Sequence, residues 1–228
     1  MTVPIDLTAI RFHRAAGADS GPHPLVVGLT GGTGVGKSTV CARLRDAGAV
    51  IVDCDQLGRD VVAPGGPALE PLFERFGPTV RAADGSLDRA ALASIVFNDP
   101  MALTALNAIT HPAIDRAIAE RIADAAPEAI VVLDMAVLVE STLGRDSYQI
   151  VAVIESTVEL RIERLAGRGM SPEDARARMA SQATDEQRRA VAHLALDNSG
   201  ELEALDKAVG ALWRRLVELE AATRSPQL

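Results

Sequence analysis

The residues best suited to chemistry form a phosphate-binding pattern near the start of the chain. Residues 31–38 read Gly-Gly-Thr-Gly-Val-Gly-Lys-Ser and fit G-x-x-x-x-G-K-[ST] at every fixed position. Glycines let the backbone N–H groups point inward, and the start of a following helix adds partial positive charge. The motif predicts that the loop binds a nucleoside triphosphate. Lys37 is expected to contact the β- and γ-phosphates, and the Ser38 hydroxyl is expected to bind Mg²⁺. The residues assigned to nucleotide binding here are Gly32, Thr33, Gly34, Val35, Gly36, Lys37, Ser38 and Thr39.

An acidic trio, Asp53-Cys54-Asp55, follows the next apolar run of the chain. Open α/β proteins bind ligands at the carboxyl ends of their strands, which makes Asp55 a candidate site residue or, alternatively, the N-cap of the following helix. Asp53 is either a plain strand-end residue or a contact to Mg²⁺ through water. Arg59 lies four residues after Asp55, so it either holds a substrate phosphate or pairs with that carboxylate.

Two arginines precede a glycine-flanked break that we expect to be a mobile lid. Arg164 and Arg168 are four residues apart and share one helical face. Guanidinium groups brought in by lid closure would stabilise a transferring phosphoryl group. The alternative is a solvated basic face balanced by Glu159 and Glu163.

Three further polar residues each keep more than one interpretation. Asn198 precedes Ser199-Gly200 and either presents its backbone to adenine or is a turn residue. His111, ahead of Pro112, either packs, caps or contacts substrate. Asp134 ends an apolar run, and its role is either a water-mediated contact to Mg²⁺ or the capping of a strand end.

Apolar runs alternate with helical segments along the chain, which predicts an α/β fold with a parallel sheet. The runs expected to be strands are 25–29, 49–53, 129–134, 149–154 and 192–196. Helical patterns cover much of 56–126, where Asp88 is a predicted N-cap and Asp99-Pro100 and His111-Pro112 are each expected to open a helix. Further helices are expected at 39–45, at 158–166, after Ser171-Pro172 and at 201–222.

Composition narrows the function classes. The net charge of −8 and a pI near 5.0 argue against a nucleic-acid partner. No apolar run approaches the roughly 18 residues that span a bilayer, and the first 24 residues, expected to be a disordered extension, lack a signal-peptide core. Cys41 and Cys54 form no metal-binding pattern, so reduced thiols in the cytoplasm are expected.

From about Leu25 to Asn198, the chain resembles dephospho-coenzyme A kinases. The resemblance implies a nucleoside-monophosphate-kinase-like fold with a five-stranded parallel core. The kinase domain would cover residues 25–222, with a helical substrate-binding part at about 56–126 and a lid at about 158–182. Residues 223–228 would form a tail. The segments that carry it, besides the loop, are Asp53-Cys54-Asp55, Leu87-Asp88-Arg89, Val96-Phe97, Leu106-Asn107, His111-Pro112, Arg164, Arg168, Ser181-Gln182 and Asp197-Asn198.

The same resemblance implies phosphorylation of the ribose 3′-hydroxyl of dephospho-coenzyme A, with ATP and Mg²⁺, by a phosphotransferase that is a monomer or weak homo-oligomer. Asp55 would accept the hydroxyl proton, Arg59 and His111 would contact the acceptor, and Asn198 would contact ATP. Lys37, Arg164 and Arg168 would stabilise the transferred group. Alternatives are a related kinase of another nucleotide or pantetheine-like acceptor, and an inactive nucleotide-binding paralogue.

Two stretches depart from the family pattern. Ala136-Val137-Leu138-Val139-Glu140 stands where the family has a Pro-Leu-Leu-Phe-Glu-like run, which changes the local packing but keeps Glu140. His193 stands where the family often has aspartate, so any charge pairing of that carboxylate is lost.

Overall fold

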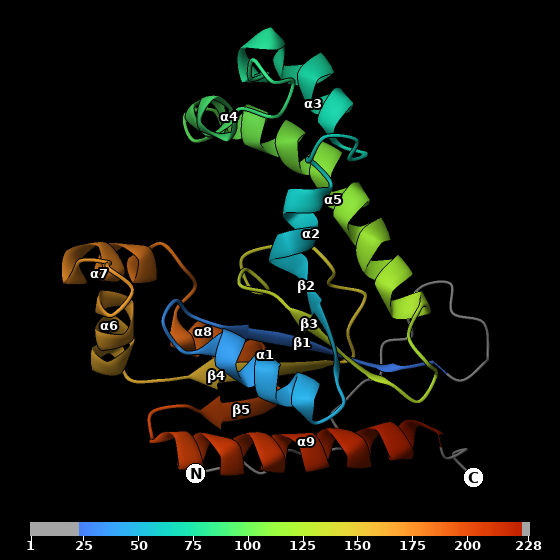
Figure 1. Cartoon of the computed structure of the whole chain (residues 1–228), viewed down its shortest axis with the longest axis vertical. Coiled ribbons are helices and arrows are strands. Elements are labelled where there is room, and N and C mark those ends of the chain that lie inside the picture. Colours follow the sequence, from blue (N-terminus) through green and yellow to red (C-terminus); the bar gives the residue numbers. More distant parts are fainter. Residues whose placement is uncertain (1–22, 225–228) are drawn as a thin grey trace. The chain divides into compact units, whose positions relative to one another are not determined.

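The computed structural model describes residues 23–224, and these include a parallel sheet of five strands (Figure 1). The predicted N-terminal extension and the tail lie almost wholly outside the described residues. The strand order is β2-β3-β1-β4-β5, which confirms the predicted α/β class with a five-stranded parallel sheet. The strands are β1 (Leu25–Gly31), β2 (Val50–Asp53), β3 (Ile130–Asp134), β4 (Ile150–Glu155) and β5 (Leu194–Asp197).

The central strand β1 is buried along its whole length, because it pairs on both sides and is covered on both faces. Val27 lies beside Val132 of β3 and Ile150 of β4. Strands buried on both faces are apolar throughout, which is why they could be located in the sequence. The phosphate loop therefore leaves the sheet from its most firmly held strand.

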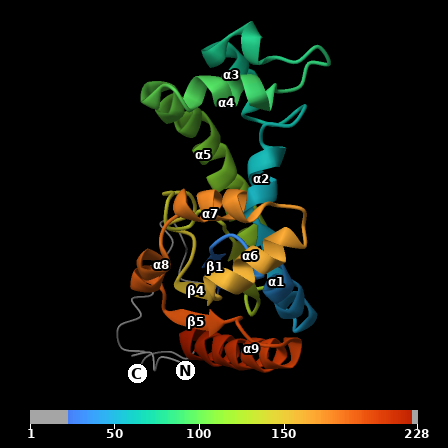
Figure 2. The same ribbon diagram turned by 90° about the vertical axis from the view of Figure 1, so that its left-hand side faces the viewer.

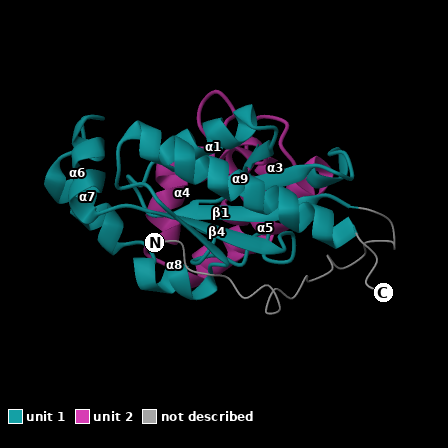
Figure 3. Ribbon diagram, turned by 90° about the horizontal axis from the view of Figure 1, so that it is seen from below, with its two compact units in different colours: residues 1–53, 122–228 teal, residues 54–121 magenta. Residues whose placement is uncertain are grey.

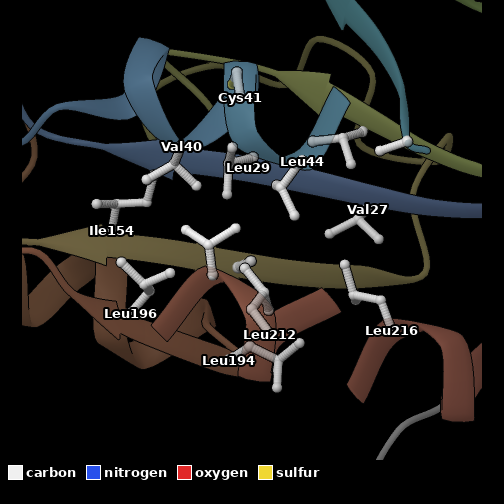
Figure 4. Packing of buried hydrophobic residues seen from close by; sticks show 14 of the residues in the cluster. Val27, Leu29, Val40, Cys41, Leu44, Ile154, Leu194, Leu196, Leu212 and Leu216 are labelled. Carbon is white, nitrogen blue, oxygen red and sulfur yellow. The ribbon is translucent and has the colours of Figure 1, made fainter. Parts of the chain in front are cut away.

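One face of the sheet is covered by α1 (Lys37–Asp46) and α9 (Leu202–Arg224). Figure 4 shows side chains of both helices meeting those of β1 and β4. Val40 and Leu44 of α1 and Leu216 of α9 are almost completely buried there. Since α1 begins at the last glycine of the loop, this core fixes the helix whose N-terminus faces the anion site.

The opposite face of the sheet packs against α8 (Asp185–Val191) and the connection between β3 and β4. Gly28 of β1 lies against Leu138 and Tyr148 of that connection. A β-carbon at Gly28 would lie 2.6 Å from Leu138 Cδ1, so this close approach requires glycine.

Two short helices, α6 (Val158–Ala166) and α7 (Pro172–Ala180), lie side by side beyond β4 (Figure 2). The Thr157 hydroxyl caps α6 by accepting the N–H of Leu160, and the Ser171 hydroxyl caps α7 by accepting that of Asp174. Both helices begin where the sequence predicted them.

The chain divides into two compact units, shown in different colours in Figure 3. The second unit is Cys54–Arg121, and the chain on either side of it forms the first. The second unit has an apolar core of its own, which includes Leu69, Phe73 and Leu92. Its elements are α2 (Cys54–Asp60), α3 (Leu69–Phe76), the 3₁₀ helix η2 (Pro78–Val80), α4 (Arg89–Val96) and most of α5 (Pro100–Ala123).

Helix starts in this second unit were predicted with mixed success. Asp88 caps α4 as predicted, since its carboxylate accepts the N–H groups of Ala90 and Ala91. The prediction that His111-Pro112 opens a helix is wrong, because both residues lie inside α5. Proline suits a first turn and also occurs inside helices at the loss of one hydrogen bond, so its sequence signal is ambiguous. Between residues 23 and 224, no helix is long and apolar enough to cross a membrane.

The sheet core yields a stability prediction. Leu216→Ala should lower the free energy of unfolding by about 2–5 kcal/mol, because it empties a fully buried position against the sheet. The neighbouring Val217 is 43% exposed, so Val217→Ala should change stability by only about 0.5 kcal/mol. Chemical denaturation followed by circular dichroism measures both, and equal losses would show that α9 does not pack as described.

Candidate functional site

The phosphate loop curls between the end of β1 and the start of α1. Gly34 and Gly36 have φ angles of 84° and 88°, which L-amino acids with side chains rarely adopt. The N–H of Val35 closes the turn by donating to the carbonyl oxygen of Gly32 at 3.2 Å. The two left-handed glycines turn alternate peptide groups to opposite sides of the chain.

Side chains from outside the loop bind its outward-facing carbonyl groups. Arg161 Nε donates to the oxygen of Thr33 at 2.8 Å. The oxygen of Val35 accepts from Asn198 Nδ2 at 2.7 Å and from Arg164 Nη1 at 3.2 Å. Helix α6 and the end of β5 thus hold the outer side of the loop.

Holding these carbonyls also sets the direction of the amides. A trans peptide is planar, so the N–H of Gly34 points away from the Thr33 carbonyl, and that of Gly36 away from the Val35 carbonyl. Neither N–H, nor those of Lys37 and Ser38 in the first turn of α1, has a hydrogen-bond partner among the described residues. Such a set of converging donors at a helix N-terminus is an anion site.

The loop glycines are also demanded by packing on the outer side. A β-carbon at Gly32 would lie 2.4 Å from Arg161 Nη2, and one at Gly36 would lie 2.5 Å from Asn198 Nδ2. At Gly34 a β-carbon would lie 2.9 Å from the carbonyl oxygen of Arg161. Glycine therefore serves both the phosphates and the support behind the loop.

Lys37 forms an ion pair with Asp134 at the end of β3, and both side chains are about five-sixths buried, with 16% and 15% exposed. This partner was not among the roles left open for Asp134. The pKa of the nearby Cys41 rises to about 12, mainly through burial and secondarily through the charge of Asp134. Cys41 is therefore a neutral thiol at physiological pH.

A cavity of about 630 Å³ opens beside the helix end of the loop. Arg164, Arg168 and Asn198, which the sequence singled out separately, all line it. Its size is typical of small-molecule sites. The remaining lining residues are Gly36, Thr39, Leu160, Glu163, Ser199, Gly200, Glu201, Leu202 and Leu205.

The two arginines differ in their surroundings. Arg164 is half-buried and, besides Val35, binds Ser156 Oγ at 3.3 Å and the carbonyl oxygen of Asn198 at 2.9 Å. Arg168 is exposed at the cavity wall. The backbone of Asn198 is engaged too, since its N–H donates to the carbonyl oxygen of Glu155 at 2.8 Å.

The residues predicted for the acceptor lie in the second unit. Asp55 is exposed and lies two residues after Asp53, the last residue of β2. The alternative that Asp55 is the N-cap of the following helix is wrong, because α2 already begins at Cys54. Arg59 Nε donates to Gln56 Oε1 at 2.9 Å. His111 is half-buried inside α5.

Sequence reasoning missed a group of polar side chains behind the loop. Arg161 is only 4% exposed and Arg188 only 1%. Burial lowers the pKa of Arg161 from its ordinary value, while the charge of Asp185 opposes the shift. Gln182, noted only as part of the family resemblance, accepts the N–H of Thr33 at 2.9 Å. No local pattern marks these partners, because they lie more than a hundred residues from the loop.

The two departures from the family pattern are accommodated. Glu140 Oε1 accepts the N–H of Ala183 at 2.8 Å, and Leu138 packs on β1. His193 pairs with β4, where its Nδ1 accepts the N–H of Val151 at 3.0 Å. Burial lowers the pKa of His193, so the imidazole stays neutral as this hydrogen bond requires.

Residues 25–204 match the family described as Dephospho-CoA kinase. A dephospho-CoA kinase of Frankia casuarinae is 48% identical over 191 residues, covering 84% of this chain and 83% of that protein. One from Streptomyces avermitilis is 48% identical over 194 residues, covering 85% of this chain and 94% of that protein.

Solved structures show the same fold. A Thermus thermophilus protein superposes with a TM-score of 0.72 at 35% identity, covering 85% of this chain and 98% of that one. The dephospho-CoA kinase from Campylobacter jejuni has a TM-score of 0.64 at 23% identity, covering 85% of this chain and 97% of that one.

The environment of His193 predicts a pH effect on stability. The unfolded chain takes up a proton near the ordinary pKa of 6.5, whereas the folded imidazole resists it to lower pH. The stabilisation is thus complete above pH 6.5 and is lost as the pH falls through the folded pKa.

Asparagine can accept the same N–H without titrating. In His193→Asn, the drop in unfolding free energy between about pH 7.5 and about pH 5 should therefore be smaller than in the unsubstituted protein. Urea denaturation at several pH values measures it. An unchanged drop would assign the acid sensitivity to other groups.

Proposed function

This chain belongs to the dephospho-CoA kinase family, and from that premise we propose how its residues carry out the reaction. The enzyme phosphorylates dephospho-CoA with ATP in the last step of coenzyme A synthesis. Nothing in the matches favours another acceptor or an inactive paralogue. The observation that carries the proposal is the loop itself, with its amides directed inward beside Lys37.

The donor phosphates occupy the loop. The N–H groups of Gly34, Gly36, Lys37 and Ser38 surround the β-phosphate, and the ammonium group of Lys37 moves between Asp134 and the phosphate oxygens. A phosphate oxygen competes well with one carboxylate, because the amides add their dipoles at the same place. Lys37 then lies where negative charge develops in the loose transition state of phosphoryl transfer.

The base and ribose of ATP occupy the cavity beside Gly36 and Thr39. Leu160 and Leu202 offer apolar surface for the purine. Arg164 and Arg168 reach toward the phosphates from the same wall. Arg164 keeps Val35 in place with one nitrogen, while the fork of a guanidinium group leaves other N–H groups for the nucleotide.

The residues around the loop fit Mg²⁺ in their chemistry. Ser38 supplies a hydroxyl, and Asp53 and Asp134 are register partners on neighbouring strands. All are oxygen donors, which Mg²⁺ prefers. No group of three or more metal-ligating side chains occurs in residues 23–224, so the ion would be held largely by phosphates and water. When bound, it supplies charge neutralisation for the phosphates.

Asp55 is the proposed general base for the ribose 3′-hydroxyl. It is exposed at the start of α2. Its proposed role is to take the proton of the hydroxyl group as the oxygen attacks the γ-phosphorus. Arg59 and His111 are proposed contacts of the acceptor. The helical part at 56–126 remains the proposed acceptor-binding segment. The segment 158–182 remains the proposed lid, with Arg161 and Gln182 near its two ends bound to Thr33 of the loop.

The remaining proposals concern the protein in the cell. Cys41 and Cys54 are both buried, and neither forms a disulfide. Cysteines in the thiol form are usual in a reducing compartment, which supports a cytoplasmic location. A monomer or weak homo-oligomer stays a prediction.

Lys37 provides the test of the donor site. Lys37→Met should lower kcat roughly 10²–10³-fold, since the charge that stabilises the transferred group is lost, with a smaller effect on ATP affinity because the amides remain. Steady-state kinetics and calorimetric ATP binding measure both. Lys207→Met changes the same charge on an exposed part of α9 and should behave like the unsubstituted enzyme. Near-normal kcat in Lys37→Met would refute the assignment.

Asp55 provides the test of the acceptor side. Asp55→Asn should lower kcat roughly 10²–10⁴-fold, while stability should change by less than about 1 kcal/mol, because the side chain is exposed in the first turn of α2 and loses only its interaction with the helix dipole. Asp60→Asn removes a carboxylate from the same helix as the control. If the asparagine variant of Asp55 were unstable but its folded fraction fully active, the residue would stabilise the fold and would not be the base.

A further inference from the structure

One residue of the phosphate loop, Thr33, is held on both sides by side chains from the 158–191 segment. Its carbonyl oxygen accepts from Arg161 Nε at 2.8 Å, and its N–H donates to Gln182 Oε1 at 2.9 Å. Arg161 and Gln182 lie 128 and 149 residues from Thr33 in the sequence. The two peptide groups that flank Thr33 are therefore fixed by distant side chains.

The Arg161 side chain is one end of a buried polar chain. Its Nη1 pairs with Asp185 at 3.3 Å, and Arg188 approaches the same carboxylate at 3.8 Å. Arg188 continues to Glu140 at 3.1 Å and also donates to the carbonyl oxygen of Ala183. The chain thus runs from the phosphate loop through α6 and α8 to the connection between β3 and β4.

We propose that Arg161 is a positioning residue for ATP, acting through the Thr33 carbonyl to aim the N–H of Gly34 at the phosphates, with Gln182 holding the preceding peptide. The Thr33 carbonyl and the Gly34 N–H belong to one planar trans peptide, so a donor on one side orients the donor on the other. Arg161 is itself too buried to touch a nucleotide. The inference rests on the proposed binding of the ATP phosphates by this loop.

A second feature favours a role beyond fold stability. Arg161 lies close to two loop glycines, since a β-carbon at Gly32 would lie 2.4 Å from its Nη2 and one at Gly34 would lie 2.9 Å from its carbonyl oxygen. Without the hydrogen bond from Arg161 Nε, the Thr33–Gly34 peptide loses the donor that fixes its orientation, and glycine accepts either orientation at little cost. A flip would turn a carbonyl oxygen toward the phosphates, where it repels them.

The experiment compares Arg161→Gln, Arg161→Lys and Gln182→Ala with the unsubstituted enzyme. ATP and ADP affinities are measured by calorimetry well below each melting temperature, together with kcat and the KM of both substrates. Arg161→Gln should weaken ATP and ADP binding roughly tenfold to a hundredfold, as expected for losing a hydrogen bond from a charged group. The KM for dephospho-CoA at saturating ATP should change less than about twofold, and Arg161→Lys should recover part of the affinity.

Arg189→Gln is the matched control, since it removes the same charge from α8, where Arg189 pairs with Glu155 on the surface. It should bind ATP normally. If Arg161→Gln lowers only the melting temperature or the active fraction, with nucleotide affinities unchanged, Arg161 stabilises the fold and the proposal is overturned. If Arg161→Gln does not fold, Gln182→Ala provides the test. Normal ATP affinity in Gln182→Ala would count against the proposal that Arg161 and Gln182 orient the loop. Failure of the unsubstituted enzyme to bind ATP would instead overturn the proposed function.

Discussion

The planarity of the peptide bond is the constraint on which the phosphate site depends. An N–H group can be aimed into a cavity only if the carbonyl behind it is accommodated on the other side. In this protein Arg161, Arg164 and Asn198 supply the donors for the carbonyls of Thr33 and Val35. The motif alone does not create the anion site. The side chains that bind the outward-facing carbonyl groups of the loop also orient its inward-facing N–H groups.

The phosphate loop also depends on the buried core of the sheet for its position. β1 and α1 flank the loop, and both belong to one apolar cluster with α9. Lys37 and Asp134 then place a positive and a negative charge at the ends of neighbouring elements, with the ammonium group close to the turn. Rigid elements on either side mean that a nucleotide meets donors already in place, which limits the entropy lost on binding.

Much of the fold could be predicted because its signals are local. Strands buried on both faces are apolar, hydroxyl and carboxylate caps precede their helices, and the loop motif is contiguous. The prediction that Pro112 opens a helix failed because proline, although it favours the first turn, also occurs inside helices at the loss of one hydrogen bond. Arg164 and Arg168 were chosen for their spacing, and both do line the cavity. Arg161, three residues earlier, had no distinguishing pattern, since its meaning lies in Thr33 and Asp185, far away in the sequence.

The contact between Gly32 and Arg161 couples the substitutions that two positions far apart in the sequence can accept. A β-carbon at Gly32 would lie 2.4 Å from Arg161 Nη2, so even an alanine there would require the Arg161 side chain to move. A side chain at position 32 is therefore expected to break the contacts of Arg161 with the loop unless position 161 also changes. Position 32, which the loop motif allows to vary, is thereby restricted by a helix that contributes no residue to the motif. Grafting this loop onto another scaffold would bring the glycine but leave behind the reason for it.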